Sequence, residues 1–555
     1  MEISEIIRRY AVENALNYGK AQPKNVLGKV LAEDLNLRKK THEVIPEVNK
    51  VVKEVNKLGK AALEREFATY GFQKKAEKKR GILADLPNVK GPVVMRFAPN
   101  PSGPLHIGHA RTAVLNDEYV KKYGGRLILR LEDTDPKRVE KDAYHMIGED
   151  LKWLGVNIDE ILTQSSRLAV YRDFAVRLIK QGNAYVCSCG QERFKKFKDS
   201  GKACPCRINP IEKNIELWNE MQDGKVGRVL NLKTDMTHKN PAMRDFPIMR
   251  VEHEHHPLTG RDWDLYPLMN FSIVVDDHLS GMTHVLRGKD HIVNTQRQLF
   301  IYDYFGWKPP EFIHNGLLNI EGVNLSTSVI KKGIDEGVYK NWSDVQLGTL
   351  RALKRRGIQP EAIRTVMKMI GIGDADVRFD WSALYAENKK IIDEKANRYF
   401  FVPNPEEIWV KGIPEEADVI RVPLHPDYPK RGYRDIIFKR SDGTTKMFIP
   451  KKDAERLKKG SMIRLKNFCN IKIEEVRPLM AKYVEGKDLG VPIVQAVPEG
   501  NLGCEVIGPE KKTAGFCEMD CRNLDHDDII QFERFGFCRV SRVDETSLLC
   551  YFAHT

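Results

Sequence analysis

Two histidines at the start of a short segment are the clearest candidates for chemistry in this sequence. His106 and His109 lie three residues apart, and the preceding loop, residues 99–105, holds three prolines and a glycine. If a helix begins near His106, both imidazoles lie on one face of its first turn. The first N–H groups of a helix lack internal partners and its dipole favours negative charge, so this turn predicts a phosphate site. The alternative is a pair of surface histidines at a helix cap.

A phosphate at this turn would accept hydrogen bonds from both imidazoles. Such donors stabilise the charge that grows on a phosphate during in-line displacement, without acting as nucleophiles. Gly108 lies between the histidines and has no side chain, so a flat base or a ribose could approach the backbone there. The pattern therefore indicates electrostatic stabilisation of a displacement at phosphorus.

The elements around this turn follow an alternation of strands and helices. The apolar run 93–95 predicts a strand, 110–120 a helix, and 127–129 a second strand that ends in the acidic turn 130–135. In parallel βαβ units, ligands bind beyond the carboxyl ends of the strands. The proline loop and the acidic turn both fall at such ends, so we expect them to form one site.

Length and charge indicate a multidomain protein with an anionic partner. With 555 residues the chain exceeds one hydrophobic core, and its net charge of +13 favours nucleic acid over a membrane surface. The sequence contains no run of about 18 apolar residues, and its acidic start differs from a basic leader. Ten cysteines in so long a chain form no dense disulfide framework. We expect a soluble protein of the cytoplasm.

The patterning predicts a Rossmann-type α/β catalytic domain with an inserted domain, an N-terminal helical domain, a helical connector and C-terminal β-barrels. The basic run 74–80 is interpreted as a solvated face rather than an RNA or partner contact. We expect the sheet to resume as a strand near 268–275, followed by a strand at 285–290 that runs into a helix to about residue 305, with a loop at 319–332. In the connector, Leu350 and Leu353 fall on one side of a helix and Arg351, Lys354, Arg355 and Arg356 on the other, and residues 441–443 predict a hairpin. The predicted regions are residues 1–90 (N-terminal helices and linker), 91–183 and 263–332 (two Rossmann halves), 184–262 (insertion), 333–402 (connector) and 403–555 (β-barrels).

Four cysteines in the predicted insertion have the spacing of a metal site. Cys187 and Cys189 form one C-x-C pair, and Cys204 and Cys206 form another, with fourteen residues between the pairs. Four thiolates can close a tetrahedral Zn²⁺ site that stabilises a small insertion without a core of its own. Free thiols are the alternative.

Two other clusters carry weaker signals. Cys517 and Cys521 form an isolated pair, to which we assign no metal. His253, His255 and His256 lie beside acidic residues without a second cluster at ligand spacing, and we interpret them as part of a solvated loop.

Long stretches around these motifs resemble one protein family. Residues 96–111, RFAPNPSGPLHIGHAR, are similar to the first signature of class I aminoacyl-tRNA synthetases in the glutamyl and glutaminyl branch. Residues 130–135, RLEDTD, and 276–290, DDHLSGMTHVLRGKD, resemble the same branch, and the likeness runs in order from about residue 93 to residue 356. The β-rich C-terminal region resembles the archaeal type, whose anticodon-binding part is a β-barrel.

The resemblance implies a two-step reaction. The α-carboxylate of L-glutamate attacks the α-phosphorus of ATP, used with Mg²⁺, and the resulting adenylate esterifies the terminal adenosine of tRNA-Glu. The archaeal group commonly also loads tRNA-Gln for later amidation, so we expect relaxed tRNA choice and a monomeric enzyme. The N-terminal helices either dock a partner such as an amidotransferase or support the catalytic domain. A glutaminyl enzyme and a catalytically weakened tRNA-binding paralogue are the alternatives.

The resemblance also implies roles for residues that match the family motifs. Arg96 is expected to hold the substrate side-chain carboxylate, because an arginine fork pairs a carboxylate in two places and discriminates against an amide; the alternative is a structural pair with Glu132. Glu132 is expected to receive the α-amino group, with a structural turn carboxylate as its alternative. The predicted catalytic residues are His106, His109, Ser326, Ser328, Lys331 and Lys332. The residues expected to bind ATP are Pro99, His106, Gly108, His109 and Leu325. The residues expected to bind glutamate are Arg96, Ala98, Asn100, Glu132, Tyr266, Met269 and Arg287.

Two departures from the family pattern stand out. The second class I signature, Lys-Met-Ser-Lys-Ser, is replaced by residues 324–328, NLSTS, which lack both lysines. We expect Lys331 or Lys332, one helical turn further on, to supply the missing charge. Met269 stands where the branch often carries a tyrosine, so that substrate contact comes from Tyr266 or is absent.

Overall fold

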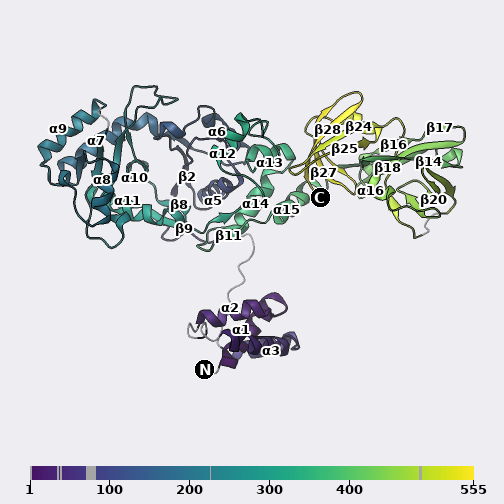
Figure 1. The fold of residues 1–555 in the computed structure, drawn as a ribbon, viewed down its shortest axis with the longest axis horizontal. Coiled ribbons are helices and arrows are strands. Elements are labelled where there is room, and N and C mark those ends of the chain that lie inside the picture. Colours follow the sequence, from purple (N-terminus) through teal and green to yellow (C-terminus); the bar gives the residue numbers. More distant parts are fainter. Residues whose placement is uncertain (1–2, 34–36, 38–40, 71–82, 225–226, 487–489) are drawn as a thin grey trace. The chain divides into compact units, whose positions relative to one another are not determined.

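The chain is described by a computed structural model that covers residues 3–33, 37, 41–70, 83–224, 227–486 and 490–555. These residues form two units, 1–80 and 81–555 (Figure 1). The basic run 74–80 lies outside the described residues. Among the described residues, no helix is long and apolar enough to cross a membrane.

The first unit is helical, as its sequence pattern predicts. Four helices bury one core of mainly valine and alanine side chains. In α3 the buried residues Val44, Val48, Val51, Val52 and Val55 recur at helical spacing, which explains why this stretch folds as an amphipathic helix. The helices are α1 (Ile3–Tyr18), α2 (Pro23–Glu33), α3 (Thr41–Val55) and α4 (Lys60–Thr69).

The second unit contains the predicted parallel sheet in two parts. Strands β1 (Val93–Phe97), β2 (Gly125–Leu131) and β3 (Glu160–Thr163) pair in that order, and β8 (His284–Gly288) pairs with β9 (Glu311–Asn315). Thr283 N donates to Val94 O at 3.0 Å, which places β8 beside β1. The strand order therefore reverses between β1 and β8, the position where Rossmann-type sheets bind ligands.

Two helices of the first half pack on one face of this sheet. Helix α5 (Ile107–Tyr123) follows β1, and α6 (Ala143–Trp153) follows β2. Their buried apolar residues share one core with Met95 of β1 and Leu129 of β2. This packing holds the start of α5 at the carboxyl end of β1.

The second half corrects two predictions about secondary structure. Residues 268–275, predicted as a strand, lie mainly in helix α10 (Met269–Leu279), and residues 319–332 end in helix α12 (Thr327–Asp335). A continuous apolar run fits a buried strand and a buried helix equally well, and α10 is buried on nearly all sides. Helix α11 (Ile292–Phe305) follows β8 as predicted.

The insertion is an antiparallel sheet covered by helices. Strands β4 (Ala184–Cys187), β5 (Val229–Leu232), β6 (Phe246–Val251) and β7 (Leu265–Pro267) pair in sequence order, so the sheet continues past residue 262. Its core includes residues of α10 and α11, which ties the insertion to the catalytic sheet. The accompanying helices are α7 (Leu168–Lys180), α8 (Gln191–Asp199) and α9 (Ile211–Gln222).

A helical connector leads to the β-rich region. Its helices are α13 (Leu350–Arg356), α14 (Pro360–Ile370) and α15 (Trp381–Ile392), with the short strands β10 (Leu318–Asn319) and β11 (Val377–Arg378) beside them. Arg356 was expected on the polar side of α13, but it is buried and donates to the carbonyls of Phe552 (3.2 Å) and Ala553 (2.6 Å). Those carbonyls belong to a strand end, and the guanidinium fastens the connector to them.

The region after residue 396 is largely β, as predicted, and contains two larger sheets with separate cores. The predicted hairpin at Asp442 and Gly443 forms, with φ of 52° and 68°. One sheet contains β14 (Pro405–Lys411), β17 (Arg440–Ser441), β18 (Thr444–Pro450), β19 (Met462–Leu465), β20 (Asn470–Val476), β21 (Leu479–Val484), β22 (Ile493–Val494) and β23 (Val497–Pro498). The other sheet contains β12 (Asn397–Tyr399), β13 (Phe401–Pro403), β24 (Leu502–Ile507), β25 (Lys512–Cys517), β26 (Ile529–Phe532), β27 (Gly536–Val543) and β28 (Ser547–His554). Outside these sheets, β15 (Val419–Pro423) pairs with β16 (Tyr433–Ile437), and the short helix α16 spans Lys451–Ala454.

Candidate active site

The two histidines form one stacked unit at the start of α5. His106 is the N-cap residue, and its Nδ1 accepts the Gly108 N–H at 3.1 Å, while the His106 N–H donates to His109 Nδ1 at 3.3 Å. The rings stack with centroids 3.7 Å apart. A Cβ at position 108 would lie 3.0 Å from the His106 ring, so any other residue there would press on the ring, whereas glycine leaves it room.

These contacts define how the imidazoles can act. Burial lowers the pKa of His106 to about 4, and burial together with His106 lowers the pKa of His109 well below its usual value. Both rings are therefore neutral near pH 7. Each Nδ1 accepts a backbone N–H, that of Gly108 for His106 and that of His106 for His109. In each neutral ring the hydrogen is therefore on Nε2, which is the atom able to donate to a phosphate.

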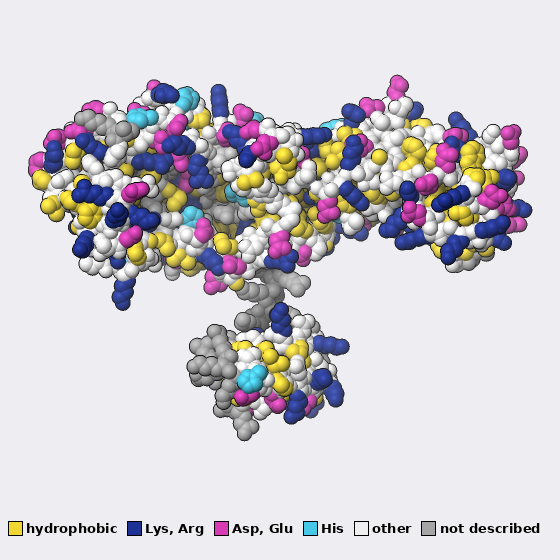
Figure 2. Space-filling view, in the orientation of Figure 1, with side chains coloured by type: hydrophobic (Ala, Val, Ile, Leu, Met, Phe, Trp, Pro, Cys, Tyr) yellow, Lys and Arg dark blue, Asp and Glu magenta, His cyan; other side chains and the backbone are white. Residues whose placement is uncertain are grey.

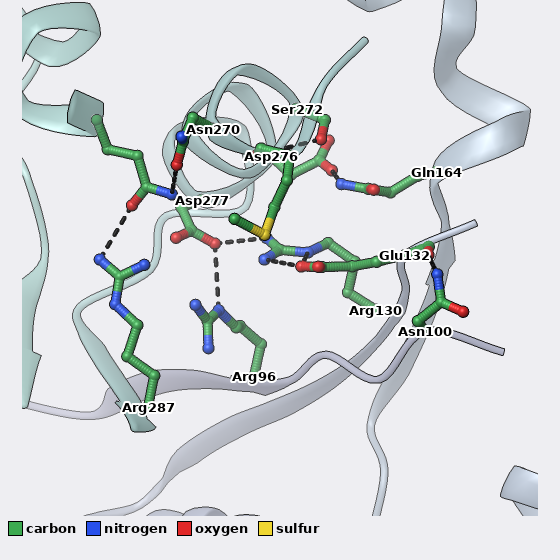
Figure 3. Close-up of polar contacts among 12 residues, drawn as sticks. Arg96, Asn100, Arg130, Glu132, Gln164, Asn270, Ser272, Asp276, Asp277 and Arg287 are labelled. Atoms are coloured by element: carbon green, nitrogen blue, oxygen red, sulfur yellow. Dashed lines mark hydrogen bonds and ion pairs between the residues drawn. The ribbon is translucent and has the colours of Figure 1, made fainter. Parts of the chain in front are cut away.

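Two hydrogen bonds connect the proline loop to the acidic turn. The Glu132 N–H donates to the Pro99 carbonyl at 3.0 Å, and Asn100 Nδ2 donates to the Glu132 carbonyl at 2.9 Å (Figure 3). The structure thus brings the two motifs together at the carboxyl ends of β1 and β2, as their positions in the sequence predict.

A cavity of about 280 Å³ lies against this junction. Tyr266 is not among the residues that line it; this tyrosine is buried in β7, with its ring beside His256. Met269, at the start of α10, does line the cavity. Of the predicted residues, Arg96, Ala98, Pro99, Asn100, His109, Glu132, Met269 and Arg287 line the cavity, together with Phe97, Thr112, Ile273, Leu286, Gly288 and His291, which sequence reasoning missed.

A buried carboxylate, Asp277, holds two of the arginines in this region (Figure 3). Asp277 Oδ1 lies 3.4 Å from Arg96 Nε and accepts a hydrogen bond from Arg130 Nη1. Arg130 also pairs with Glu132 at 2.9 Å, so the alternative of an Arg96–Glu132 pair is not realised. Sequence reasoning assigned Asp277 no role, although two adjacent aspartates in an apolar run are a signal, because buried carboxylates require cations.

Arg287 is the third arginine of this region, and among the described contacts it has no acidic partner. Its guanidinium donates to Gln298 at 3.0 Å and to Thr295. Burial and then the neighbouring Arg96 lower the pKa of Arg287 to about 10. Three guanidinium groups, those of Arg96, Arg130 and Arg287, therefore meet two carboxylates, those of Asp277 and Glu132, which leaves one positive charge for a ligand.

The neighbouring Asp276 has a structural function. It accepts hydrogen bonds from Gln164 (2.8 Å) and Tyr171 (2.7 Å) and pairs with Arg167 at 2.9 Å. These partners lie at the start of α7 and just before it, so Asp276 binds α10 to the helix that leads into the insertion.

The altered second signature lies against the proline loop. Thr327 Oγ1 is 3.2 Å from Ser102 Oγ, and Ser326 and Ser328 are exposed with their hydroxyls 3.1 Å apart. Lys331 lies on α12 and pairs with Glu140. Lys332, also on α12, is exposed and pairs with Glu336 at 3.6 Å. Leu325 packs against the core beneath α5.

The histidine cluster differs in part from its prediction. His253 and His255 are exposed, but the interpretation as a solvated loop is wrong for His256, which is fully buried. Its Nε2 lies 2.9 Å from the Asp133 carbonyl and its Nδ1 accepts the Leu258 N–H at 3.2 Å. His256 thereby fastens the insertion to the acidic turn.

The four cysteines of the insertion converge. Sγ of Cys187 lies 3.8 Å from that of Cys204, and Sγ of Cys189 lies 3.6 Å from that of Cys206. All four sulfurs lie within 4.8 Å of one another. Cys517, by contrast, belongs to no such group within the described part of the chain.

Comparison with known proteins identifies the class. The family model for the catalytic domain of class I tRNA synthetases (E and Q) matches residues 92–394, and models for the anticodon-binding domain of the same class match 396–486 and 496–541. The chain belongs to this family. A glutamate–tRNA ligase of Methanocaldococcus jannaschii is 51% identical, and one of Methanococcus maripaludis strain C7 is 47% identical, each over 100% of both chains. That of Methanopyrus kandleri is 44% identical over 100% of this chain and 99% of its own. These relatives confirm the resemblance to the archaeal type.

The low pKa of His106 predicts its titration. In the folded protein the ring should stay neutral down to a pH of about 4, whereas the unfolded chain takes up the proton near 6.5. This histidine therefore favours unfolding increasingly as the pH falls from about 6.5 to about 4. Side-chain NMR of the histidines, with His106 assigned from His106→Asn, measures the pKa directly. A midpoint near 6.5 in the folded protein would contradict the prediction.

Proposed function

We propose that this protein activates L-glutamate with ATP and esterifies it to the 3′ end of tRNA-Glu. The observation that carries the proposal is the single uncompensated positive charge beside the His106 turn. L-glutamate, with two carboxylates and one ammonium group, has one negative charge and matches it, whereas glutamine is neutral. Relatives that are glutamate–tRNA ligases over the full length of the chain support the same substrate.

In this proposal the cavity residues divide the substrate between them. Arg96 binds the side-chain carboxylate and Arg287 faces the substrate from β8, while Glu132 accepts hydrogen bonds from the α-ammonium group. Glutamine would leave a guanidinium without a counter-charge in a desolvated cavity, and unpaired buried charge is costly. Ala98, Asn100 and Met269 shape the walls of the cavity, whereas Tyr266 does not line it and is given no part in binding.

The His106 turn takes the ATP phosphates. Nε2 of His106 and of His109 donates to the α-phosphate side, and Pro99, Gly108 and Leu325 lie at the adenosine side. An oxygen of the glutamate α-carboxylate attacks the α-phosphorus, the bond to the bridging oxygen breaks, and pyrophosphate leaves with that electron pair. Mg²⁺, which the family uses with ATP, neutralises phosphate charge. Ser326 and Ser328 border the pyrophosphate side.

The tRNA partner is assigned to the insertion, the connector and the β-rich region. Figure 2 shows Lys and Arg side chains spread over the face in view of residues 81–555 rather than gathered in one patch. Binding through many such cations should depend steeply on salt. We further propose that the enzyme acts as a monomer in the cytoplasm, that it also loads tRNA-Gln, and that the N-terminal helices serve either to dock an amidotransferase or to support the catalytic domain.

We assign a structural Zn²⁺ to the cysteine cluster. Zn–S bonds of about 2.3 Å place tetrahedrally arranged sulfurs about 3.8 Å apart. The separations of 3.8 Å and 3.6 Å within the two cross-pairs are close to this value, and all four sulfurs lie within 4.8 Å of one another. Bound Zn²⁺ would cross-link β4 to the segment that follows α8.

Charging assays test the substrate choice. Labelled glutamate and labelled glutamine are each offered with transcripts of tRNA-Glu and of tRNA-Gln. We expect glutamate on both tRNAs and no glutamine on either. Charging of glutamine would indicate the glutaminyl enzyme, and no charging at all would indicate a weakened paralogue. Rejection of tRNA-Gln alone would refute only the relaxed tRNA choice.

Substitution of Arg96 tests the specificity mechanism. In Arg96→Gln we expect kcat/KM for glutamate to fall by about 100-fold and the preference over glutamine to narrow, because a charged bidentate contact is lost. Arg126→Gln is the matched control, since Arg126 lies on β2 and makes an exposed pair with Glu160. Equal behaviour of the two variants would show that Arg96 does not read the side chain.

The lysines of α12 are tested together. Replacing Lys331 and Lys332 with alanine should slow ATP–pyrophosphate exchange by about 100-fold, the effect of losing a preorganised charge in the transition state. Release of Lys331 from Glu140 on ATP binding is part of this proposal. Lys340→Ala, in the exposed segment that follows α12, is the control. An unchanged exchange rate in the double variant would assign the missing charge elsewhere.

Metal analysis tests the zinc assignment. The purified protein should contain about one Zn²⁺ per chain, as expected for a four-thiolate site. In Cys189→Ser we expect zinc content and the unfolding temperature to fall together. Cys469→Ser, which changes a buried thiol of the β-rich region, should keep its zinc. Full zinc content in Cys189→Ser, or none in the wild type, would overturn the assignment.

A further inference from the structure

A buried carboxylate next to the His106 turn has no role in the chemistry above. Asp150 lies on α6 and is 3% exposed. Its Oδ2 accepts the Leu105 N–H at 2.9 Å, and its Oδ1 lies 3.2 Å from Arg351 Nε. Asp150 is outside the residues that line the 280 Å³ cavity. A buried charge is costly and is weak evidence for a purely stabilising function, so its contacts call for another explanation.

Those contacts converge on the peptide that precedes His106. Leu105 is 1% exposed, so its N–H has no access to water. Its carbonyl accepts the Leu350 N–H at 2.8 Å, and the Ile107 N–H donates to the Gly348 carbonyl at 2.9 Å. The backbone on both sides of His106 is thus clamped by α6 on one side and by the start of α13 on the other.

The second partner of Asp150 anchors the clamp itself. Arg351, the second residue of α13, also pairs with Glu149 and donates to the Met146 carbonyl at 3.2 Å. Both of those residues belong to α6. Through these contacts Arg351 ties the start of α13 to α6 beside the turn.

The geometry points to Asp150 as a positioning residue for the ATP phosphates. By accepting the Leu105 N–H, its carboxylate holds the His106–His109 stack at the distance from the α-phosphate that displacement requires. This inference rests on the proposed function of His106 and adds to it a residue that touches no substrate. Loss of the acceptor would leave a buried N–H unpaired and allow the turn to shift.

The test measures ATP–pyrophosphate exchange with tRNA-Glu transcript present. For Asp150→Ala we expect kcat to fall about 10- to 100-fold, as small displacements of reacting groups do, with KM for glutamate changed by less than about twofold. Asp150→Asn keeps an acceptor oxygen for the Leu105 N–H and should restore kcat to within about threefold of wild type. Asp142→Ala is the matched control, because Asp142 is an exposed carboxylate at the start of α6 whose side chain makes no cap hydrogen bond, and it should behave as wild type.

Each result has a defined meaning. Wild-type kcat in Asp150→Ala, an equal loss in Asp150→Asn, or a parallel rise in KM for glutamate would overturn the inference. Should Asp150→Ala not fold, Asp150→Glu moves the same carboxylate by one methylene and should lower kcat by at least about fivefold; wild-type kcat there would overturn it. His106→Ala, measured alongside, separates the proposals. Normal exchange in that variant would refute the function of His106, whereas slow exchange beside a normal Asp150→Ala would refute only the positioning function.

Discussion

The charge of Asp277 is the constraint on which the cavity depends. Arg96 and Arg130 come from the first half of the catalytic sheet, and Asp277 comes from the second half, 181 residues after Arg96. A guanidinium buried without a carboxylate is costly, so the first half depends on the second half for the carboxylate beside Arg96. The intervening insertion must fold so that α10 returns to the sheet, and Asp276 and His256 bind that insertion back to the catalytic half.

The same arrangement explains why the cavity suits an anionic amino acid. The arginines are held from behind by Asp277, so their positions are set before a ligand enters. Preorganised groups lose little freedom when a ligand binds, so less of the interaction energy is spent on ordering them. In the proposed function, selectivity for glutamate over glutamine rests on charge balance rather than on shape, because the two side chains have nearly the same size.

Local motifs account for what could be predicted. The strand, tight turn and helix start around His106 depend on neighbours in sequence, and so do the C-x-C pairs and the hairpin at Asp442 and Gly443. The error at residues 268–275 has a different origin. An apolar run specifies burial but not period, so whether it forms a strand or a helix is decided by what it packs against. In this protein it packs between the insertion and the sheet as α10.

By itself the sequence determined the class of chemistry, the parallel arrangement at the turn, the cysteine spacing and the β-rich character of the last third, since each rests on contacts between near neighbours or on composition. Only the tertiary structure decided that Asp277 pairs with Arg96, that Glu132 pairs with Arg130, that Arg356 is buried, and that Asp150 reaches Leu105. The physical reason is common to all four. Charged side chains are matched across the folded interior by distance and burial, and a one-dimensional pattern of residue types contains neither quantity.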